Sequence, residues 1–351
     1  MPRTTILEEE ALCGRSPAAP LSDDRRNLMK KLALLACGLF LLSACGDNNT
    51  SDLNPNSITY EPTVSTVPAT ETPSKTVETI EPGEAEVVEP SSGYPAAIVS
   101  LSPTATEMLF AIGAGPQVLA VDEYSYWPPE APVVDGLSGW NPNVEAIATF
   151  EPDLVILSDN GIQQELELLG IDVYVASAAI ELEDVWAQML EIGEITGQTD
   201  RATSAVDDMK ERIAEILSSI ERPETPISYY HELDDTLYSV TSATFIGKIY
   251  SLAGLTNIAD PADEDGTSWG YPQLGEEFVL QADPDMIFFA DAQCCGQSIE
   301  TISARPGWSE LRAIRNKNIF EINSDISSRW GPRLVNFLEI VALAIANVNE
   351  N

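Results

Sequence analysis

Short apolar runs alternate with amphipathic segments along residues 96–180. Strand-like runs are expected at 97–101, 118–121, 154–157 and 173–175. Ser102-Pro103 after the first run is typical of a helix N-cap followed by a first-turn proline, and Gly113 or Gly115 ends that helix. Apolar strands that alternate with helices indicate a parallel sheet covered on both faces.

The middle of the chain has a helical period instead. Apolar residues recur every three or four positions from Glu183 to Ile220. Gly197 interrupts this run, so a second helix begins near Thr199, and Arg222-Pro223 ends it. A long helix at this point predicts a connector between two α/β units.

The alternation then returns. Strands are expected at 227–230, 237–240, 286–290 and 319–322, and helices at 244–253 and 334–348. The pattern therefore predicts two similar α/β lobes with parallel sheets: an N-lobe at about 96–180, a connecting helix at about 199–222 and a C-lobe at about 225–351.

One short sequence motif occurs once in each lobe. Glu145 stands before Pro152-Asp153 and an apolar run, and Glu277 stands at the same spacing before Pro284-Asp285 and another apolar run. The repetition predicts one acidic residue at an equivalent place on each lobe. Such a pair of carboxylates suits a protein that holds a ligand between its lobes and docks both lobes on a partner.

The first 45 residues resemble an export signal. Lys30-Lys31 precede the apolar run 32–42, and Leu42-Ser43-Ala44-Cys45 resembles a bacterial lipobox. The Cys45 thiol would then carry lipid and begin the mature chain, anchored outside the cytoplasm on the cell membrane. Arg25-Arg26 also resembles a twin-arginine motif, so the start at Met1 or Met29 and the export route stay open.

Residues 46–95 are rich in Ser, Thr, Pro and acidic residues. Such a composition buries too little apolar surface to offset the entropy of ordering, so a disordered tether is expected. No second long apolar segment follows, and nothing else in the sequence is expected to span the bilayer.

Composition narrows the partners and the chemistry. The chain has 56 acidic against 18 basic residues and a net charge of −38, which disfavours nucleic acid and anionic membrane as partners. It has no nucleophile elbow, phosphate loop or zinc signature, so we expect no catalytic residues, no metal site and no cofactor. Three interpretations of Cys294-Cys295 stay open: a buried turn, a vicinal disulfide or a ligand contact.

A family resemblance emerges from motifs that occur in a fixed order. They include Ser102-Pro103-Thr104-Ala105-Thr106-Glu107, residues 124–128, Trp140 to Glu145, Pro152-Asp153, Gly307-Trp308 and residues 324–333. Together they resemble the helical-backbone periplasmic binding proteins for cobalamin, haem and ferric siderophores, across residues 96–350. That family has two α/β lobes joined by one long helix, with the ligand cleft between the lobes.

Within this family, the cobalamin-binding member is the most similar. The resemblance implies a monomer that captures a cobalamin-like corrinoid and delivers it to an ABC permease and its ATPase. Glu145 and Glu277 match the lobe-tip glutamates that dock on arginine pockets of the permease. Docking of this kind is physically reasonable, because carboxylates form charge-assisted hydrogen bonds with arginine. The alternative to a docking role is that both residues are solvated acids at helix N-termini.

The same resemblance implies a ligand site. Aromatic residues in positions like Tyr124, Trp140, Tyr238 and Trp269 wall the corrin, and residues spaced like Asp325 and Arg329 reach its amide edge. A flat, amphipathic macrocycle suits aromatic faces with a few polar groups. The segment after Asp325 and the Cys294-Cys295 pair depart from the cobalamin-binding pattern.

Three alternatives remain at this point. A ferric siderophore would use clustered bases such as Arg305, Arg329 and Arg333, but the acidic composition favours a neutral ligand. Haem would need an axial His or Tyr, and His231 is the single histidine. A lipid-anchored sensor or adhesin is a different class, and would not need two matched carboxylates.

Overall fold

A computed structural model describes residues 93–350. The expected signal sequence 1–45 with Cys45, and the expected tether up to residue 92, lie outside the described residues. Within residues 93–350, no helix combines the length and apolar character needed to cross a bilayer.

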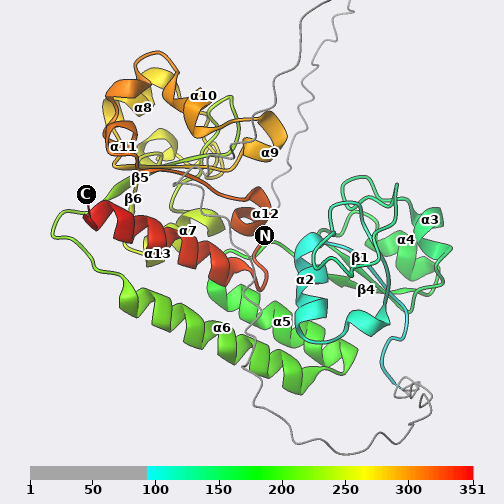
Figure 1. Ribbon diagram of the computed structural model, residues 1–351. Helices are drawn as coiled ribbons and strands as arrows, with labels where there is room; N and C mark the ends of the chain where they lie inside the picture. Colours follow the sequence, from blue (N-terminus) through cyan, green and yellow to red (C-terminus); the bar gives the residue numbers. More distant parts are fainter. Residues whose placement is uncertain (1–92, 351) are drawn as a thin grey trace, which may run out of the picture. The chain divides into compact units, whose positions relative to one another are not determined.

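The N-lobe is built on a four-stranded parallel sheet (Figure 1). Its strands are β1 (Ile98–Leu101), β2 (Val118–Val121), β3 (Leu154–Leu157) and β4 (Asp172–Val175), in the order β2-β1-β3-β4. The central strands β1 and β3 are buried along their whole length, which explains their uninterrupted apolar sequences. All four predicted strands of this lobe are confirmed to within one residue.

The helices of the N-lobe are α2 (Pro103–Ala111), η1 (Gly115–Gln117), α3 (Val144–Ala148) and α4 (Gln163–Leu168). Side chains cap helices α2 and α3. As predicted, Ser102 caps α2, and its hydroxyl accepts a hydrogen bond from the Ala105 amide at 3.3 Å. Asn143 caps α3 in the same way.

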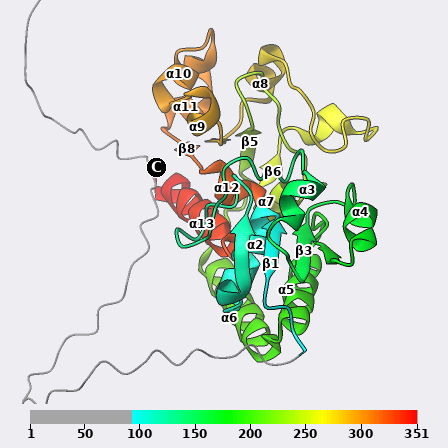
Figure 2. The same ribbon diagram turned by 90° about the vertical axis from the view of Figure 1, so that its right-hand side faces the viewer.

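Two helices lead from the N-lobe to the C-lobe. They are α5 (Leu182–Thr196) and α6 (Thr199–Ser219), separated by Gly197 at a φ of 75°. Helix α5 packs on α2 and on α6, and α6 also packs on the closing helix α13 (Leu334–Glu350) (Figures 1 and 2). The predicted connector is therefore confirmed as α6, with α5 as its support on the N-lobe side.

The C-lobe repeats the sheet topology of the N-lobe. Its strands are β5 (Ser228–Glu232), β6 (Thr256–Asn257), β7 (Met286–Phe289) and β8 (Ile319–Glu321), in the order β6-β5-β7-β8 and all parallel. Its helices are α7 (Phe245–Leu252), η2 (Asp260–Asp263), α8 (Glu276–Ala282), α9 (Ala292–Cys295), α10 (Ile299–Ser303), η3 (Trp308–Glu310), α11 (Arg312–Arg315), α12 (Ser324–Ser328) and α13.

One predicted strand is wrong. Residues 237–240 form a single bridge, between Tyr238 and Gln273, instead of a sheet strand. Leu237 has a φ of 67°, a left-handed conformation that no regular strand contains. The edge of the sheet is occupied instead by β6, whose Thr256-Asn257 pair gave no apolar signal.

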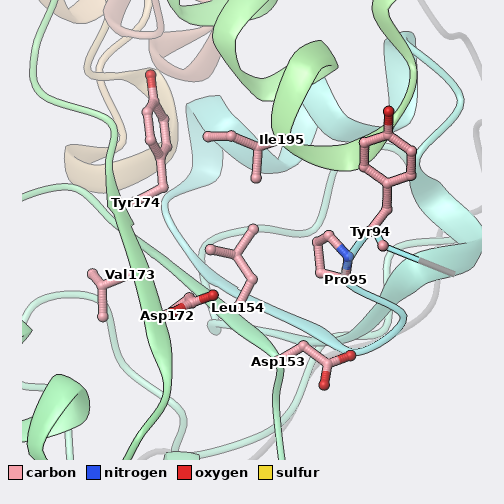
Figure 3. A pocket seen from close by; sticks show the side chains of 9 residues that line it. Tyr94, Pro95, Asp153, Leu154, Asp172, Val173, Tyr174 and Ile195 are labelled. Atoms are coloured by element: carbon pink, nitrogen blue, oxygen red, sulfur yellow. The ribbon is translucent and has the colours of Figure 1, made fainter.

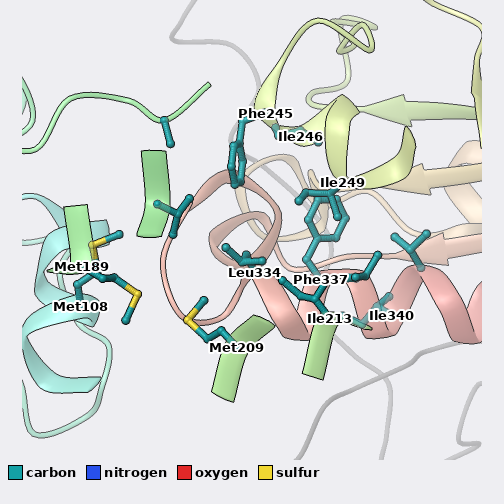
Figure 4. Close-up of a cluster of buried hydrophobic side chains, with 14 of the residues drawn as sticks. Met108, Met189, Met209, Ile213, Phe245, Ile246, Ile249, Leu334, Phe337 and Ile340 are labelled. Atoms are coloured by element: carbon teal, nitrogen blue, oxygen red, sulfur yellow. The ribbon is translucent and has the colours of Figure 1, made fainter. Parts of the chain in front are cut away.

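A buried apolar cluster runs from one lobe to the other (Figure 4). Met108 and Met189 belong to the N-lobe side, Met209 and Ile213 lie on α6, and Phe337 lies on α13. Because one core serves both lobes and the connector, the hydrophobic effect holds these elements together as a unit.

The repeated motif has the same structural role in both lobes. The Asp153 carboxylate accepts hydrogen bonds from the Ala96 and Ala97 amides at 2.8 and 3.0 Å, just before β1. The Asp285 carboxylate accepts from the amide and hydroxyl of Ser228, the first residue of β5, at 2.9 and 2.7 Å. Each aspartate thus ties the start of its lobe's first strand to the next strand in the sheet.

Candidate functional site

Four aromatic residues stand on the loops that follow the carboxyl ends of the strands. Tyr124 follows β2, Trp140 precedes α3, Tyr238 follows β5, and Trp269 lies between β6 and α8. All four are exposed, Trp140 to 94 % and Trp269 to 88 %. Single exposed apolar residues are common on protein surfaces, so the indication of a ligand is that all four stand beyond the carboxyl ends of the strands.

Hydrogen bonds between side chains and backbone amides fix the loops that carry the two tryptophans. The Ser138 hydroxyl accepts from the amides of Trp140 and Asn141 at 3.3 and 3.2 Å. The Asp263 carboxylate accepts from the amides of Ser268 and Gly270, each at 2.7 Å, on either side of Trp269. Both indole rings are therefore exposed on ordered turns.

The backbone at Trp269 is unusual. Its φ is 55°, and the next residue, Gly270, has a φ of 87°. A Cβ on Gly270 would lie 2.6 Å from the Thr244 methyl, so only glycine fits there. Non-glycine residues with positive φ cost free energy and cluster at functional sites, so this turn supports a role for Trp269.

Tyr238 and Trp269 lie on neighbouring chain segments. The Tyr238–Gln273 bridge is extended by hydrogen bonds from the Ser239 amide to the Pro272 carbonyl and from the Thr241 amide to the Gly270 carbonyl, at 2.9 and 2.8 Å. The two predicted aromatic contacts of the C-lobe therefore belong to one local surface.

Tyr124 is held by a buried acid. The Asp122 carboxylate accepts from the Tyr124 amide at 2.8 Å and from the Ser125 hydroxyl at 2.7 Å. Burial raises the pKa of Asp122 above its ordinary value, although both hydrogen bonds act in the opposite direction. The turn that presents Tyr124 thus has its own internal support.

Asp325 and Arg329 join Tyr124 through what we call the Glu107 network: Glu107, Asp325, Arg329, Arg333 and Tyr126. Arg329 donates to Asp325 at 2.8 Å, to the Tyr124 carbonyl at 3.0 Å and to Glu107 at 2.9 Å. The Tyr126 hydroxyl donates to the other oxygen of Asp325. The structure therefore unites three of the six predicted ligand residues, namely Tyr124, Asp325 and Arg329.

Arg329, which the family resemblance predicts to reach the ligand, is largely buried. It is only 8 % exposed, and its guanidinium already has protein partners, whereas Asp325 is partly exposed. Sequence reasoning missed Glu107 as the reason for this burial. Its position inside the Ser102–Glu107 motif marked the residue, but the motif did not show which arginines it would meet.

Glu145 and Glu277 occupy equivalent places. Glu145 is in the first turn of α3 and Glu277 is in the first turn of α8, and both side chains are exposed. A first-turn acid interacts favourably with the helix dipole. These positions therefore fit two solvated acids at helix N-termini as well as they fit docking residues.

The other candidate bases are occupied. The Arg305 guanidinium forms two hydrogen bonds of 2.6 Å to Glu232, which is fully buried at the end of β5. Arg333 donates to Glu107 at 2.6 and 2.9 Å. The arginines named as possible siderophore contacts are thus neutralised by protein carboxylates.

His231 is also unavailable to a ligand. It is fully buried in β5, and its Nδ1 lies 2.8 Å from the Tyr250 hydroxyl. Burial lowers the pKa of His231 to about 3, so the ring is neutral at ordinary pH.

The cysteine pair lies on α9, directly after β7. Both thiols are free and exposed, so the interpretation as a buried turn is wrong. The fold removes part of the water around the Cys294 sulfur, and this desolvation together with the neighbouring Cys295 thiol raises the pKa of Cys294 to about 11. Within residues 93–350, no group of three or more His, Cys, Asp or Glu side chains could hold a metal ion.

A cavity of about 550 Å³ opens at the opposite end of the N-lobe sheet (Figure 3). Tyr94, Asp153, Asp172, Tyr174 and Ile195 are among its lining residues, and Asp153 and Asp172 stand at the amino ends of β3 and β4. Ligands of parallel α/β sheets bind beyond the carboxyl ends of the strands, so this cavity is a poor candidate for the main site.

Comparison with known proteins agrees with the fold. A family model described as periplasmic binding protein matches residues 98–326. The chain belongs to this family. Its two parallel-sheet lobes, its connecting helix and its exposed aromatic loops are thus parts of a solute-binding protein of the ABC-transporter type.

Three proteins that are similar to this chain serve as examples from the family. A cobalamin-binding protein of Halobacterium salinarum is 30 % identical over 271 residues, which are 72 % of this chain and 70 % of the relative. An uncharacterized ABC transporter substrate-binding lipoprotein of Bacillus subtilis is 28 % identical, and the match covers 72 % of this chain and 80 % of the relative. The crystal structure of the periplasmic vitamin B12 binding protein of Vibrio cholerae is 25 % identical, with a TM-score of 0.60 and coverage of 73 % and 99 %.

The fold alone is shared more widely. A periplasmic haem binding protein of Vibrio cholerae has a TM-score of 0.62 at 23 % identity, and covers 70 % of this chain and 97 % of its own. Fold similarity therefore does not choose between a corrinoid and haem, and the choice depends on the site residues.

Proposed function

We propose that this protein is the extracytoplasmic solute-binding component of an ABC importer, and that its ligand is a cobalamin-like corrinoid. The observation that carries the proposal is the set of exposed aromatic residues, Tyr124, Trp140, Tyr238 and Trp269, on ordered loops at the carboxyl ends of both sheets. Relatives named for cobalamin or vitamin B12 support the same ligand class.

The chemistry of these residues fits a large, flat, neutral ligand. Tyrosine and tryptophan offer wide apolar faces with one polar atom each, which suits a macrocycle with an amide-bearing rim. Asp325 is partly exposed and would accept hydrogen bonds from ligand amides, while Arg329 would act at its edge or hold Asp325 in place.

The alternatives are less well supported. A ferric siderophore with negative charge would enter an acidic protein whose three candidate arginines already face carboxylates. Haem would need an accessible axial ligand; the single histidine is fully buried, so an exposed tyrosine such as Tyr124 or Tyr238 would have to serve.

A titration with three ligands tests the proposal. Cyanocobalamin, haemin and a ferric siderophore are added separately to the chain without its signal sequence, and tryptophan fluorescence is recorded. We expect saturable quenching by cyanocobalamin, weakened at least tenfold by Trp269→Ala or Trp140→Ala. Leu168→Ala is the control, because Leu168 is 79 % exposed on α4, outside the aromatic loops. Saturation by haemin or the siderophore alone would reject the corrinoid.

We further propose that Glu145 and Glu277 dock the two lobes on the permease, while lipid on Cys45 holds the monomer at the membrane and residues 46–95 act as the tether. The support is that both glutamates are exposed at equivalent positions of a repeated structure. Carboxylates can form short charge-assisted hydrogen bonds with arginine on a mating surface.

Charge reversal separates docking from ligand capture. Glu145→Lys and Glu277→Lys together should abolish uptake of labelled cobalamin by cells and leave the affinity of the isolated protein unchanged. Glu165→Lys is a matched control, because Glu165 is also an exposed first-turn acid of an N-lobe helix. Normal uptake by the double variant, or loss of ligand affinity, contradicts the docking role.

A further inference from the structure

Glu107 is a buried acid in the middle of α2 that meets two arginines from the far end of the chain. It is 3 % exposed and accepts hydrogen bonds from Arg329 Nη1 at 2.9 Å, Arg333 Nε at 2.9 Å and Arg333 Nη2 at 2.6 Å. The two arginines follow β8 of the C-lobe, whereas α2 belongs to the N-lobe. One carboxylate therefore joins elements of both lobes.

The arginines carry this connection to the loop that presents Tyr124. Arg329 donates to the Tyr124 carbonyl at 3.0 Å, and its guanidinium lies 5.3 Å from the centre of the Tyr126 ring. The Arg333 guanidinium lies 4.8 Å from the centre of the Trp127 ring. Both contacts have the cation–π geometry, so residues 124–127 are held by the same cations that Glu107 binds.

The charges in the Glu107 network balance. Two carboxylates, Glu107 and Asp325, face two guanidiniums, and Tyr126 supplies a further donor to Asp325. Buried ion pairs are held in one arrangement only when their hydrogen bonds are satisfied, and removal of one partner leaves a costly unpaired charge. An ion pair between Lys248 and Glu181 also links the two lobes, but it is more exposed and contributes less.

We propose that Glu107 is a positioning residue for ligand capture: it fixes Arg329 and Arg333, and through them sets Tyr124 and Asp325 beside each other at the mouth of the site. This inference rests on the proposed function, in which Tyr124 and Asp325 contact the ligand. A binding site gains affinity when its contact residues are held in place before the ligand arrives.

Two readouts on the intact chain test the role of Glu107. Glu107→Gln keeps the shape of the side chain but removes its charge. We expect at least a tenfold loss of cyanocobalamin affinity, and faster amide hydrogen exchange in residues 124–127 without any ligand. Glu232→Gln is the matched control, because Glu232 is also a buried carboxylate with two bonds to one arginine, but within the C-lobe.

A double change adds a test that general instability cannot imitate. If Glu107 acts through Arg333, then Glu107→Gln combined with Arg333→Gln should weaken affinity by less than the product of the two single effects. Arg333→Lys, which keeps the charge and loses the bidentate geometry, should give a smaller loss of the same kind. It also serves as the test variant if Glu107→Gln does not fold.

The outcomes for Glu107 and for the proposed function are distinct. Unchanged exchange in residues 124–127 of the Glu107→Gln protein overturns the positioning role, whatever the ligand is. Equal losses of affinity in Glu107→Gln and Glu232→Gln also overturn it, because both would then reflect general destabilisation. A wild-type protein that fails to bind cyanocobalamin rejects the corrinoid, while the exchange result still decides the role of Glu107.

Discussion

Two clusters of buried charge lie at the carboxyl ends of the sheets; one contains two arginines and two carboxylates, and the other contains one arginine and two carboxylates. In the Glu107 network, two arginines converge on one carboxylate, and Asp325 completes the balance. In the C-lobe, Arg305 is bonded to Glu232, and a second carboxylate, Asp291, lies close to both but receives no hydrogen bond. The first cluster joins the lobes, and the second lies within one lobe.

The two clusters differ in whether their buried carboxylates have hydrogen-bond partners. Glu107 accepts three hydrogen bonds, whereas both carboxylate oxygens of Asp291 are buried without a hydrogen-bond partner. Burial, reinforced by the neighbouring Glu232 carboxylate, raises the pKa of Asp291 to about 7. At neutral pH the unpaired Asp291 carboxylate therefore opposes folding, whereas Glu107 and Asp325 each have an arginine partner.

The largest expected effect comes from breaking the balanced cluster. Glu107→Gln leaves Arg333 without its carboxylate and should reduce the free energy of unfolding by about 3–5 kcal/mol, measured by urea denaturation. Glu232→Gln should cost less, because Arg305 can then turn to Asp291. An equal or larger cost for Glu232→Gln would show that the two clusters do not differ in the way described.

Substitution of Asp291 should increase the free energy of unfolding, whereas substitution of Glu107 decreases it. Asp291 has a raised folded pKa, so its contribution is neutral below its ordinary value of 3.8 and becomes unfavourable as the pH rises toward 7. Asp291→Asn removes this cost. Relative to the wild type, the variant should be about equally stable at pH 4 and about 4 kcal/mol more stable at pH 8.

Urea denaturation of both proteins at the two pH values checks this prediction. Asp291→Leu, which also removes the charge, should show the same direction. A variant that is less stable than the wild type at pH 8 would mean that the Asp291 carboxylate has a favourable partner.

The smallest effect concerns His231, the neighbour of Glu232 on β5. Its folded pKa of about 3 lies below the ordinary value of 6.5, so stability from the neutral ring is complete above pH 6.5 and is lost as the pH falls. Relative to His231→Gln, the wild type should lose about 2 kcal/mol between pH 6.5 and pH 5.

Nuclear magnetic resonance provides a direct control for this residue, because the chain has a single histidine. The imidazole resonances of the folded protein should stay constant down to pH 5. A titration midpoint near 6.5 in the folded protein would show that the ring is accessible to water.

Sequence patterns predicted the parts of the fold whose cause is local. Strands such as β1 and β3 are continuous apolar runs because both faces are buried, and Gly197 ends α5 because the chain there is left-handed. β6 was missed because two polar residues at a sheet edge have no periodicity. The false strand at 237–240 has strand-like composition but a turn at Leu237.

The site was predicted in part for the same reason. The aromatic residues could be found from their polar and Gly/Pro neighbours and from family resemblance. The partners of Arg329 could not be found, since Glu107 lies 222 residues away and only the packing of α2 against the segment after β8 brings them together. Asp291 and Glu232 gave no signal, because a buried acid looks like any other acid in sequence.

The location of the ligand is the central claim, and hydrogen exchange with and without cyanocobalamin measures it most directly. We predict protection in the loops around Tyr124, Trp140, Tyr238, Trp269 and Asp325, and none around Tyr94 and Asp172. Protection confined to the cavity at the amino ends of β3 and β4, with no change in the aromatic loops, would contradict the account.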